Sequence, residues 1–199
     1  MFILSNLLYN DKRKDKTQPL WKKTQLQKNE ELNSSTFNSG KYISFNIPGE
    51  PMGKGRPRFS TFNGYVRTHT PKETTTYENK VIMSYRQEHE EMVFANNEMI
   101  HAEIDAYFLI PKTRYRFHKK TNTTDLDKLG LEMLENKVRP TKKPDCDNIA
   151  KIVLDALNGI AYYDDSQVVS LVVRKHYAET THVKVMLCSA DMVEGEHNE

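Results

Sequence analysis

The chain of 199 residues is long enough for one domain with a buried core, and two full-sized domains would be a tight fit. Its formal charge is only +2, but residues 112–143 hold ten Lys and Arg against four acids, and residues 50–72 hold five against one. No run approaches the roughly 18 uncharged apolar residues of a membrane helix, which excludes an integral membrane protein. The basic middle of the chain favours a polyanionic partner.

Two cysteines, Cys146 and Cys188, are too few for a disulfide framework, and neither has the spacing of a zinc site. The apolar run at the start of the chain is too short for a membrane anchor and lacks the features of a signal peptide. We therefore expect a cytoplasmic protein in a reducing compartment, with no membrane association.

Composition divides the chain into three parts. Residues 1–40 are rich in Lys, Asn, Gln, Ser and Thr without sustained periodicity, which predicts a polar tail, either partly disordered or a marginal helix. Residues 41–189 are expected to fold as one domain. Residues 190–199 carry four acids and no Lys or Arg, which predicts an acidic tail.

Periodicity within residues 41–189 predicts the elements in chain order. The predicted elements are a strand over 42–47, a helix over about 74–94, a strand over 99–110, a helix over 147–158, and strands over 167–177 and 182–188. Residues 114–144 form a polar, basic insertion whose Leu and Met spacing also allows a short helix over 125–137. Gly159 is the residue type favoured just after a helix end. This order predicts a two-layer α+β domain with helices on one face of a mixed or antiparallel sheet.

Acidic residues gather around the predicted helix 147–158. Asp145 directly precedes the helix. Asp147, Lys151 and Asp155 follow at intervals of four residues and therefore lie on one helix face. The pair Asp164-Asp165 follows six residues past the helix end.

Several carboxylates at one place repel one another, by roughly 1 to 4 kcal/mol for each pair at 4 Å, unless a cation lies among them. Oxygen ligands without Cys or His select a hard ion such as Mg²⁺ or Mn²⁺. Such an ion beside a phosphate activates water and neutralises charge on the leaving oxygen. The acids therefore predict a metal site.

Each acidic motif also has an ordinary explanation: Asp147 as a helix cap, Asp147 with Lys151 as a surface ion pair, and Asp164-Asp165 as a turn. Taken together they favour a ligand, because paired acids flank both ends of one helix with a lysine between them. Other templates fit worse, since Ile149 stands where a DxDx[TV] phosphatase needs Thr or Val, and no Walker motif is present.

The segment Gly53-Lys-Gly-Arg-Pro-Arg58 combines glycines, which let backbone approach a ligand, with three cations. Aromatic residues that can contact sugars or bases follow closely in the sequence. In a chain with a metal-type acidic cluster we interpret this segment as a clamp on a phosphate backbone, with a solvated hairpin tip as the alternative. The residues expected to contact DNA are Lys54, Arg56, Arg58, Arg67, Lys142 and Lys143.

The run from Lys143 to Gly159, with Asp164-Asp-Ser-Gln-Val168, closely resembles the signature of the RusA-like Holliday-junction resolvases, crossover junction endodeoxyribonucleases common in phages and prophages. Residues 53–58 and 70–78 also resemble the family's N-terminal segments, so the resemblance covers about residues 42–188.

The resemblance implies catalytic metal ligands at Asp145, Asp147 and Asp165, with Asp164 as an additional ligand and Lys151 also required for catalysis. It further implies Mg²⁺, for which Mn²⁺ can substitute, no nucleotide cofactor, and a homodimer that cuts four-way DNA junctions symmetrically in recombination and repair. The N-terminal tail is extra relative to the family, and Cys146 replaces an aliphatic residue between the acids.

Two other functions stay open: a catalytically inactive branched-DNA-binding protein of the same fold, and a metal-dependent nucleotide phosphohydrolase. The intact acids and lysine argue against the first. The extended basic segments argue against the second, because a small substrate needs no long cationic surface. We therefore expect a metal-dependent, structure-selective endodeoxyribonuclease that resolves four-way junctions.

Overall fold

The structure, a computed structural model, describes residues 41–62 and 65–191. The predicted tail over residues 1–40 lies outside these described residues, as do residues 192–199 of the predicted acidic tail. Within the described part of the chain, no helix is both long enough and apolar enough to cross a membrane.

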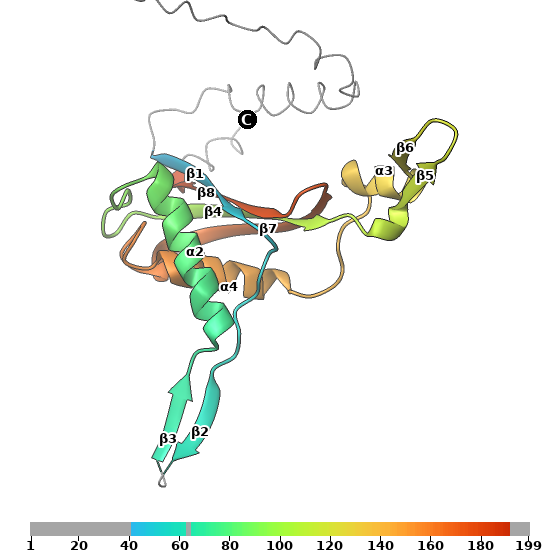
Figure 1. Ribbon diagram of the computed structural model, residues 1–199. Helices are drawn as coiled ribbons and strands as arrows, with labels where there is room; N and C mark the ends of the chain where they lie inside the picture. The colour runs from blue at the N-terminus through green and yellow to red at the C-terminus, as the bar shows by residue number, and fades with distance from the viewer. Residues whose placement is uncertain (1–40, 63–64, 192–199) are drawn as a thin grey trace, which may run out of the picture. The chain divides into compact units, whose positions relative to one another are not determined.

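A four-stranded sheet forms the centre of the domain, in the order β1–β8–β4–β7 (Figure 1). Its strands are β1 (Tyr42–Pro48), β4 (Ile100–Leu109), β7 (Val168–Ala178) and β8 (His182–Ser189). β4 pairs in parallel with β7, whereas β1 and β4 both pair antiparallel with β8. The sheet is therefore mixed, and the predicted strands are confirmed to within about two residues at each end.

Two helices, α2 (Lys72–Glu88) and α4 (Cys146–Leu157), cover one face of this sheet (Figure 1). Ile100, Ala102, Ile104 and Ala106, alternate residues of β4, are fully buried, and the apolar face of α4 packs into the same core. Burying each large apolar side chain contributes roughly 1.5 to 3 kcal/mol, so this layer supplies much of the stability. The predicted α+β architecture with helices on one face is confirmed.

The limits of both helices differ from prediction. α2 begins at Lys72, directly after Pro71, and ends at Glu88 instead of Phe94. Acids at positions 88, 90 and 91 oppose continuation, because carboxylates at a helix C-terminus face its negative end. Phe94 turns back into the core, where its N–H donates to the Ala161 carbonyl at 3.2 Å.

α4 begins one residue earlier than predicted, at Cys146, and Gly159 follows its end with φ of +67°. A positive φ is unfavourable for most residues and readily adopted by glycine. The predicted role of Gly159 just past the helix end is confirmed.

The insertion between β4 and α4 contains more structure than predicted. It holds η1 (Lys112–Arg114), the β5–β6 hairpin (Tyr115–His118 and Thr123–Leu126) and α3 (Lys128–Leu134). The expected short helix is present but covers only the middle of 125–137. Asp127 caps α3 by accepting a 2.8 Å hydrogen bond from the Gly130 N–H. A small second core around Ile110, Met133 and Tyr177 supports the insertion.

A second hairpin, missed from the periodicity, joins the basic loop to α2. Its strands are β2 (Arg58–Phe62) and β3 (Tyr65–His69), which pair antiparallel with Phe62 opposite Tyr65. The sequence signal was the dipeptide Asn63-Gly64, which two-residue hairpin connections favour.

Candidate functional site

The first acids of the predicted site stand where the chain enters α4. Asp145 occupies the N-cap position with extended backbone, and its carbonyl accepts from the Ile149 N–H at 3.0 Å. Its side chain makes no capping hydrogen bond. The exposed carboxylates of Asp145 and Asp147 both lie near the positive end of the helix, which stabilises negative charge there.

The ordinary explanations for Asp147 and Lys151 do not hold in the structure. Asp147 lies inside the first turn of α4 and does not cap it, and the only hydrogen bond to its carboxylate from a described residue comes from the neighbouring Asn148 side chain at 3.3 Å. Asp147 and Lys151 form no ion pair, and Lys151 has no salt-bridge partner among the described residues. Both side chains are exposed. Neither therefore has an evident structural role.

The second acidic pair divides into one structural and one free carboxylate. Asp164 caps η2 (Asp165–Gln167), accepting from the Ser166 N–H at 2.9 Å. Hydrogen bonds from Ser166 lower the pKa of Asp164. Gln167 completes this cap through the Tyr163 and Asp164 N–H groups. The Asp165 side chain is exposed and has no hydrogen bond or ion pair with a described residue, so both of its oxygens are available to a ligand, whereas Asp164 Oδ1 is engaged in the cap.

The two acidic pairs lie at opposite ends of α4. The 12 residues of this helix span about 18 Å at 1.5 Å per residue, with Asp145 at its start. At the other end, the Tyr162 hydroxyl donates to the Leu154 carbonyl at 2.9 Å. Burial raises the pKa of Tyr162, and the negative charges of Asp165, Asp155 and Asp164 raise it further. The segment η2, which holds Asp165, packs against α4.

The placement of the two acidic pairs at opposite ends of α4 determines whether one chain can hold a metal ion. Among the described residues, no three His, Cys, Asp or Glu side chains are close enough together to form a metal site. The carboxylates are the ligand type that Mg²⁺ prefers, but one chain does not bring Asp145, Asp147 and Asp165 together. The predicted convergence of the acids is therefore not found within a single chain.

The basic loop packs against the start of α4. The Lys54 N–H donates to the Asn148 carbonyl at 2.9 Å. A Cβ atom at Gly53 would lie 2.9 Å from the Pro144 Cβ and 3.0 Å from the Asn148 Cβ, so this close approach requires glycine. The loop and the helix N-terminus therefore form one packed unit.

Lys54 is not a free cation. Its ammonium contacts the Glu78 carboxylate of α2 and lies 2.8 Å from Asp155 Oδ2 of α4, with only 23% of its side chain exposed. Burial lowers the pKa of Lys54, but hydrogen bonds and charge from Asp155 and Glu78 outweigh this effect and raise it. Lys54 thus ties the two helices together, and its predicted contact with phosphate remains a prediction.

The other predicted DNA contacts fall into two groups. Arg56, Lys142 and Lys143 are exposed, the last two in the segment directly before Asp145. Arg58 and Arg67 are placed in the β2–β3 hairpin, but their side chains lie outside the described part of the structure. Lys175 of β7, which sequence reasoning missed, fixes the segment before α4 by donating to the Lys142 and Pro144 carbonyls at 2.6 and 3.1 Å.

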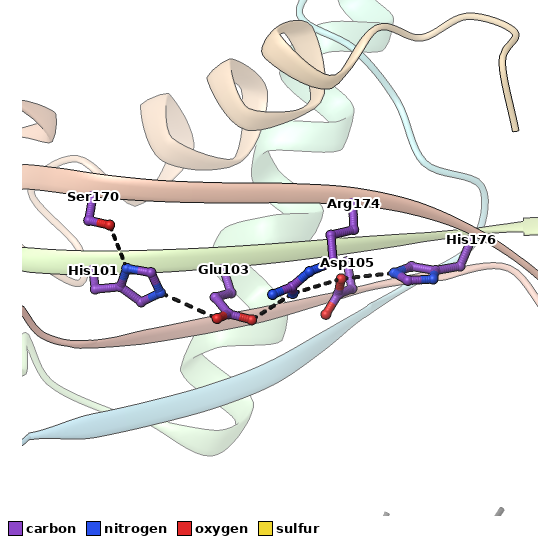
Figure 2. Close-up of polar contacts among 6 residues, drawn as sticks. All are labelled: His101, Glu103, Asp105, Ser170, Arg174 and His176. Atoms are coloured by element: carbon purple, nitrogen blue, oxygen red, sulfur yellow. Dashed lines mark hydrogen bonds and ion pairs between the residues drawn. The ribbon is translucent and has the colours of Figure 1, made fainter. Parts of the chain in front are cut away.

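A polar network on β4 and β7 was also missed, because its members look scattered in the sequence (Figure 2). Arg174 Nη1 lies 2.7 Å from Glu103 Oε2 and 3.3 Å from Asp105 Oδ1. His101 and His176 contact these two carboxylates from either side. Burial raises the pKa of both acids, but hydrogen bonds and charge from Arg174 and the histidines outweigh it, so that both pKa values are lowered. Alternate strand residues place this network on the sheet face opposite the helical layer.

The α+β domain, with exposed acids and a lysine beside basic segments, has the character of a nucleic-acid-cleaving protein. The family model of endodeoxyribonuclease RusA matches residues 48–188. A protein of Bacillus subtilis (strain 168), the uncharacterized protein YqaN, is 37% identical over 145 residues, which cover 73% of this chain and 94% of that protein.

The chain belongs to the RusA endodeoxyribonuclease family, as its sequence motifs predicted. This family places it among the Holliday-junction endonucleases of DNA recombination, which act on branched DNA.

Proposed function

We propose that the protein is a homodimeric, Mg²⁺-dependent endonuclease that resolves four-way DNA junctions by paired phosphodiester hydrolysis in recombination and repair. The observation that carries this proposal is the charge at the start of α4: the side chains of Asp145, Asp147 and Lys151 are exposed and make no capping hydrogen bond and no ion pair among the described residues. Two carboxylates and a lysine at the start of one helix are the groups needed to hold a hard cation and to contact a phosphate. We place this activity in the cytoplasm, where a junction-cutting enzyme meets DNA.

The separation of the two acidic pairs supports a site shared by two copies of the chain. A two-fold axis that crosses the middle of α4 brings Asp145 and Asp147 of one copy toward Asp165 of the other, and produces two identical sites. Four-way junctions also call for two cuts related by symmetry. The dimer and the metal site are thus one proposal: the second chain supplies the carboxylate that the first lacks.

Each residue then has a distinct role. Asp145, Asp147 and Asp165 hold Mg²⁺, for which Mn²⁺ substitutes, and the bound ion supplies activation of water and neutralisation of the leaving oxygen. Lys151, one helical turn from Asp147, contacts the phosphate that is cut. Arg56, Lys142 and Lys143 hold neighbouring phosphates without reading sequence. Asp164 serves the fold of η2, and Lys54 positions the loop against α4.

The experiment that tests this function compares substrates and metals with the full-length protein. We expect purified protein to cut a labelled four-way junction at symmetric positions in Mg²⁺, and to leave linear duplex and free nucleotides largely uncut. Junction binding without cleavage in either Mg²⁺ or Mn²⁺ would favour an inactive branched-DNA-binding protein. Hydrolysis of nucleotides but not junctions would favour a phosphohydrolase.

A further inference from the structure

The β5–β6 hairpin carries charge that neither the fold nor the proposed cleavage site uses. Arg116, Lys119 and Lys120 are exposed and make no ion pair with any described residue. The paired acid of this hairpin, Asp125, lies 3.7 Å from His118 Nε2. By contrast, the nearby Lys128 and Lys137 lie 4.0 Å from Glu132 and 2.6 Å from Glu135 respectively. The hairpin therefore carries three cations and one acid, Asp125, which stands opposite Arg116 in the strand register, so positive charge is in excess. The two lysines in and after α3 are each paired with an acid.

The base of the hairpin is firmly held. Asp127, which follows β6, forms an ion pair with Arg114 at 3.2 Å. The Asp127 N–H also donates to the Arg114 carbonyl at 2.8 Å. Tyr115 and Leu126, the residue pair at this base, pack against the small second core. A cationic hairpin on a fixed base presents its charges in a constant direction, which reduces the entropy lost when it binds.

The hairpin belongs to the end of the sheet where α4 begins (Figure 1). His176 of β7 lies 2.6 Å from Asn136, just after α3, and Lys175 binds the carbonyls that precede Asp145. These contacts tie the insertion to the strand end that also holds the start of α4. DNA that passes Asp147 toward this end of the domain therefore runs toward the hairpin.

We propose that the β5–β6 hairpin grips the phosphate backbone of a junction arm outside the cut position, through Arg116, Lys119 and Lys120. The inference rests on the proposed function, which supplies the DNA at Asp147. Duplex DNA carries one negative charge for about every 1.7 Å of its axis, so an arm that extends past the site offers a row of partners to these cations. The contact holds DNA without reading its sequence.

The test compares two double variants with the same reduction of charge in the full-length protein. Lys119→Gln with Lys120→Gln removes two unpaired hairpin cations, and Lys128→Gln with Lys137→Gln removes two exposed cations that are already paired. Junction binding is measured without divalent metal over a range of salt concentrations. Thermal melting confirms that both variants fold as the wild type does.

We expect the hairpin variant to lower the slope of log affinity against log salt by about 0.9 for each phosphate that the protein no longer neutralises, and the control variant to leave the slope unchanged. Phosphate ethylation interference should place the phosphates that depend on the hairpin lysines within an arm, away from the scissile phosphates. An unchanged slope in the hairpin variant, or dependent phosphates confined to the crossover, would overturn the inference. Failure of the wild-type protein to bind junctions at all would instead contradict the proposed function.

Discussion

At the scale of single residues, the structure separates charges that hold the fold from charges that do not. Lys54 is held between Glu78 and Asp155, whereas Lys151 on the same helical layer has no partner among the described residues. In the sequence both lysines were assigned to the DNA site, Lys54 through its basic loop and Lys151 through the acidic face of its helix. Only the three-dimensional contacts distinguish the positioning lysine from the one available to a substrate.

The unused acids lead to a prediction about turnover. Asp147→Asn keeps the shape of the side chain but removes its charge and most of its affinity for a divalent ion. We expect junction cleavage in Mg²⁺ to fall by about a thousandfold or more, since each 1.36 kcal/mol of lost transition-state stabilisation is a factor of ten. Junction binding, measured by gel shift, should be retained or strengthened because one repulsive charge is gone.

The matched control is Asp164→Asn, since Asp164 serves as a cap and the amide of the variant retains one acceptor oxygen. We expect this variant to cleave at a rate within about tenfold of the wild-type rate, because the substitution leaves the stabilisation of the transition state largely intact. Wild-type cleavage by Asp147→Asn, or loss of cleavage by Asp164→Asn alone, would reverse the roles assigned to these two acids.

At the same scale, sequence reasoning identified which residue types belong to a cleavage site but not how they are used. The motif around Asp145 and Asp147 was visible because acids, lysine and apolar residues share one helical period. Asp164 was predicted as an additional metal ligand, and that role stays a prediction. The sequence did not show that one of its oxygens also caps η2, because a capping carboxylate and a metal ligand have the same sequence pattern. Lys175 could not be predicted, since its partners are carbonyl oxygens 33 and 31 residues away in the chain.

At the scale of elements, long periodic segments were predicted well and short hairpins were not. β4 alternates apolar and polar residues from Ile100 to Tyr107, and α4 has a continuous apolar face, so the local pattern matches the side that is buried in the core. The hairpins β2–β3 and β5–β6 are short, and short strands outside the main sheet lack the alternation that burial in a core imposes. The prediction of α2 was too long because the apolar spacing extends to Phe94, whereas the acids at positions 90 and 91 oppose a helix beyond Glu88.

The loop that joins β1 to the β2–β3 hairpin carries two cations that are close in sequence but differ in their contacts. Lys54→Gln leaves the carboxylates of Glu78 and Asp155 without their shared partner, so we expect urea denaturation to give a loss of about 1 to 3 kcal/mol in unfolding free energy. Arg56→Gln removes an exposed cation and should leave stability within about 0.5 kcal/mol.

The same two variants should also differ in the salt dependence of junction binding, which Arg56→Gln should change and Lys54→Gln should not. Arg56→Gln is expected to reduce the salt dependence of junction binding by a slope of about 0.9. The proposed division of roles would be contradicted if Arg56→Gln destabilised the fold as much as Lys54→Gln and left the salt slope unaltered.

The strands β4 and β7 carry a pH dependence that follows from the polar network in Figure 2. The lowered pKa values of Glu103 and Asp105 mean that the folded state binds protons less tightly than the unfolded state. Their contribution to stability is therefore fully present above the unfolded pKa values, which are about 4, and is lost as pH falls through the folded values.

Arg174→Met removes the cation that both carboxylates share, so their pKa values in the folded state should rise. We expect the variant to lose about 1 to 2 kcal/mol at neutral pH, and to unfold at a higher pH than the wild type during acid titration followed by circular dichroism. Arg139→Met, a change of an exposed arginine with no ion pair among the described residues, serves as the control. Identical acid transitions for Arg174→Met and wild type would remove this network from the stability of the sheet.

At the scale of the whole molecule, the central claim is that one chain holds only half of each cleavage site. Asp145 and Asp147 lie at the start of α4, a helix about 18 Å long, and Asp165 lies in η2, beyond the end of that helix. Among the described residues of one chain, these acids form no group that could hold an ion. Sequence reasoning expected the acids to converge because it had no measure of where the chain returns after the helix. The strand β7 starts at the far end of α4, and the second copy of the chain is the proposed source of the missing ligand.

The most direct test is complementation between two inactive variants. Asp147→Asn and Asp165→Asn chains, each carrying a different affinity tag, are co-expressed and their heterodimers are isolated by sequential purification. If the site is shared, one of the two sites in this heterodimer contains only wild-type carboxylates, while the other carries both substitutions. If each site lies within one chain, both sites of the heterodimer carry one substitution.

The measurement is cleavage of a labelled four-way junction in Mg²⁺ by the heterodimer, with both homodimeric variants as controls. The proposed shared site predicts that the homodimers are inactive and that the heterodimer nicks one strand at about half the wild-type rate per dimer, because one of two sites works. A heterodimer as inactive as its parents, beside an active wild type, would contradict the shared site.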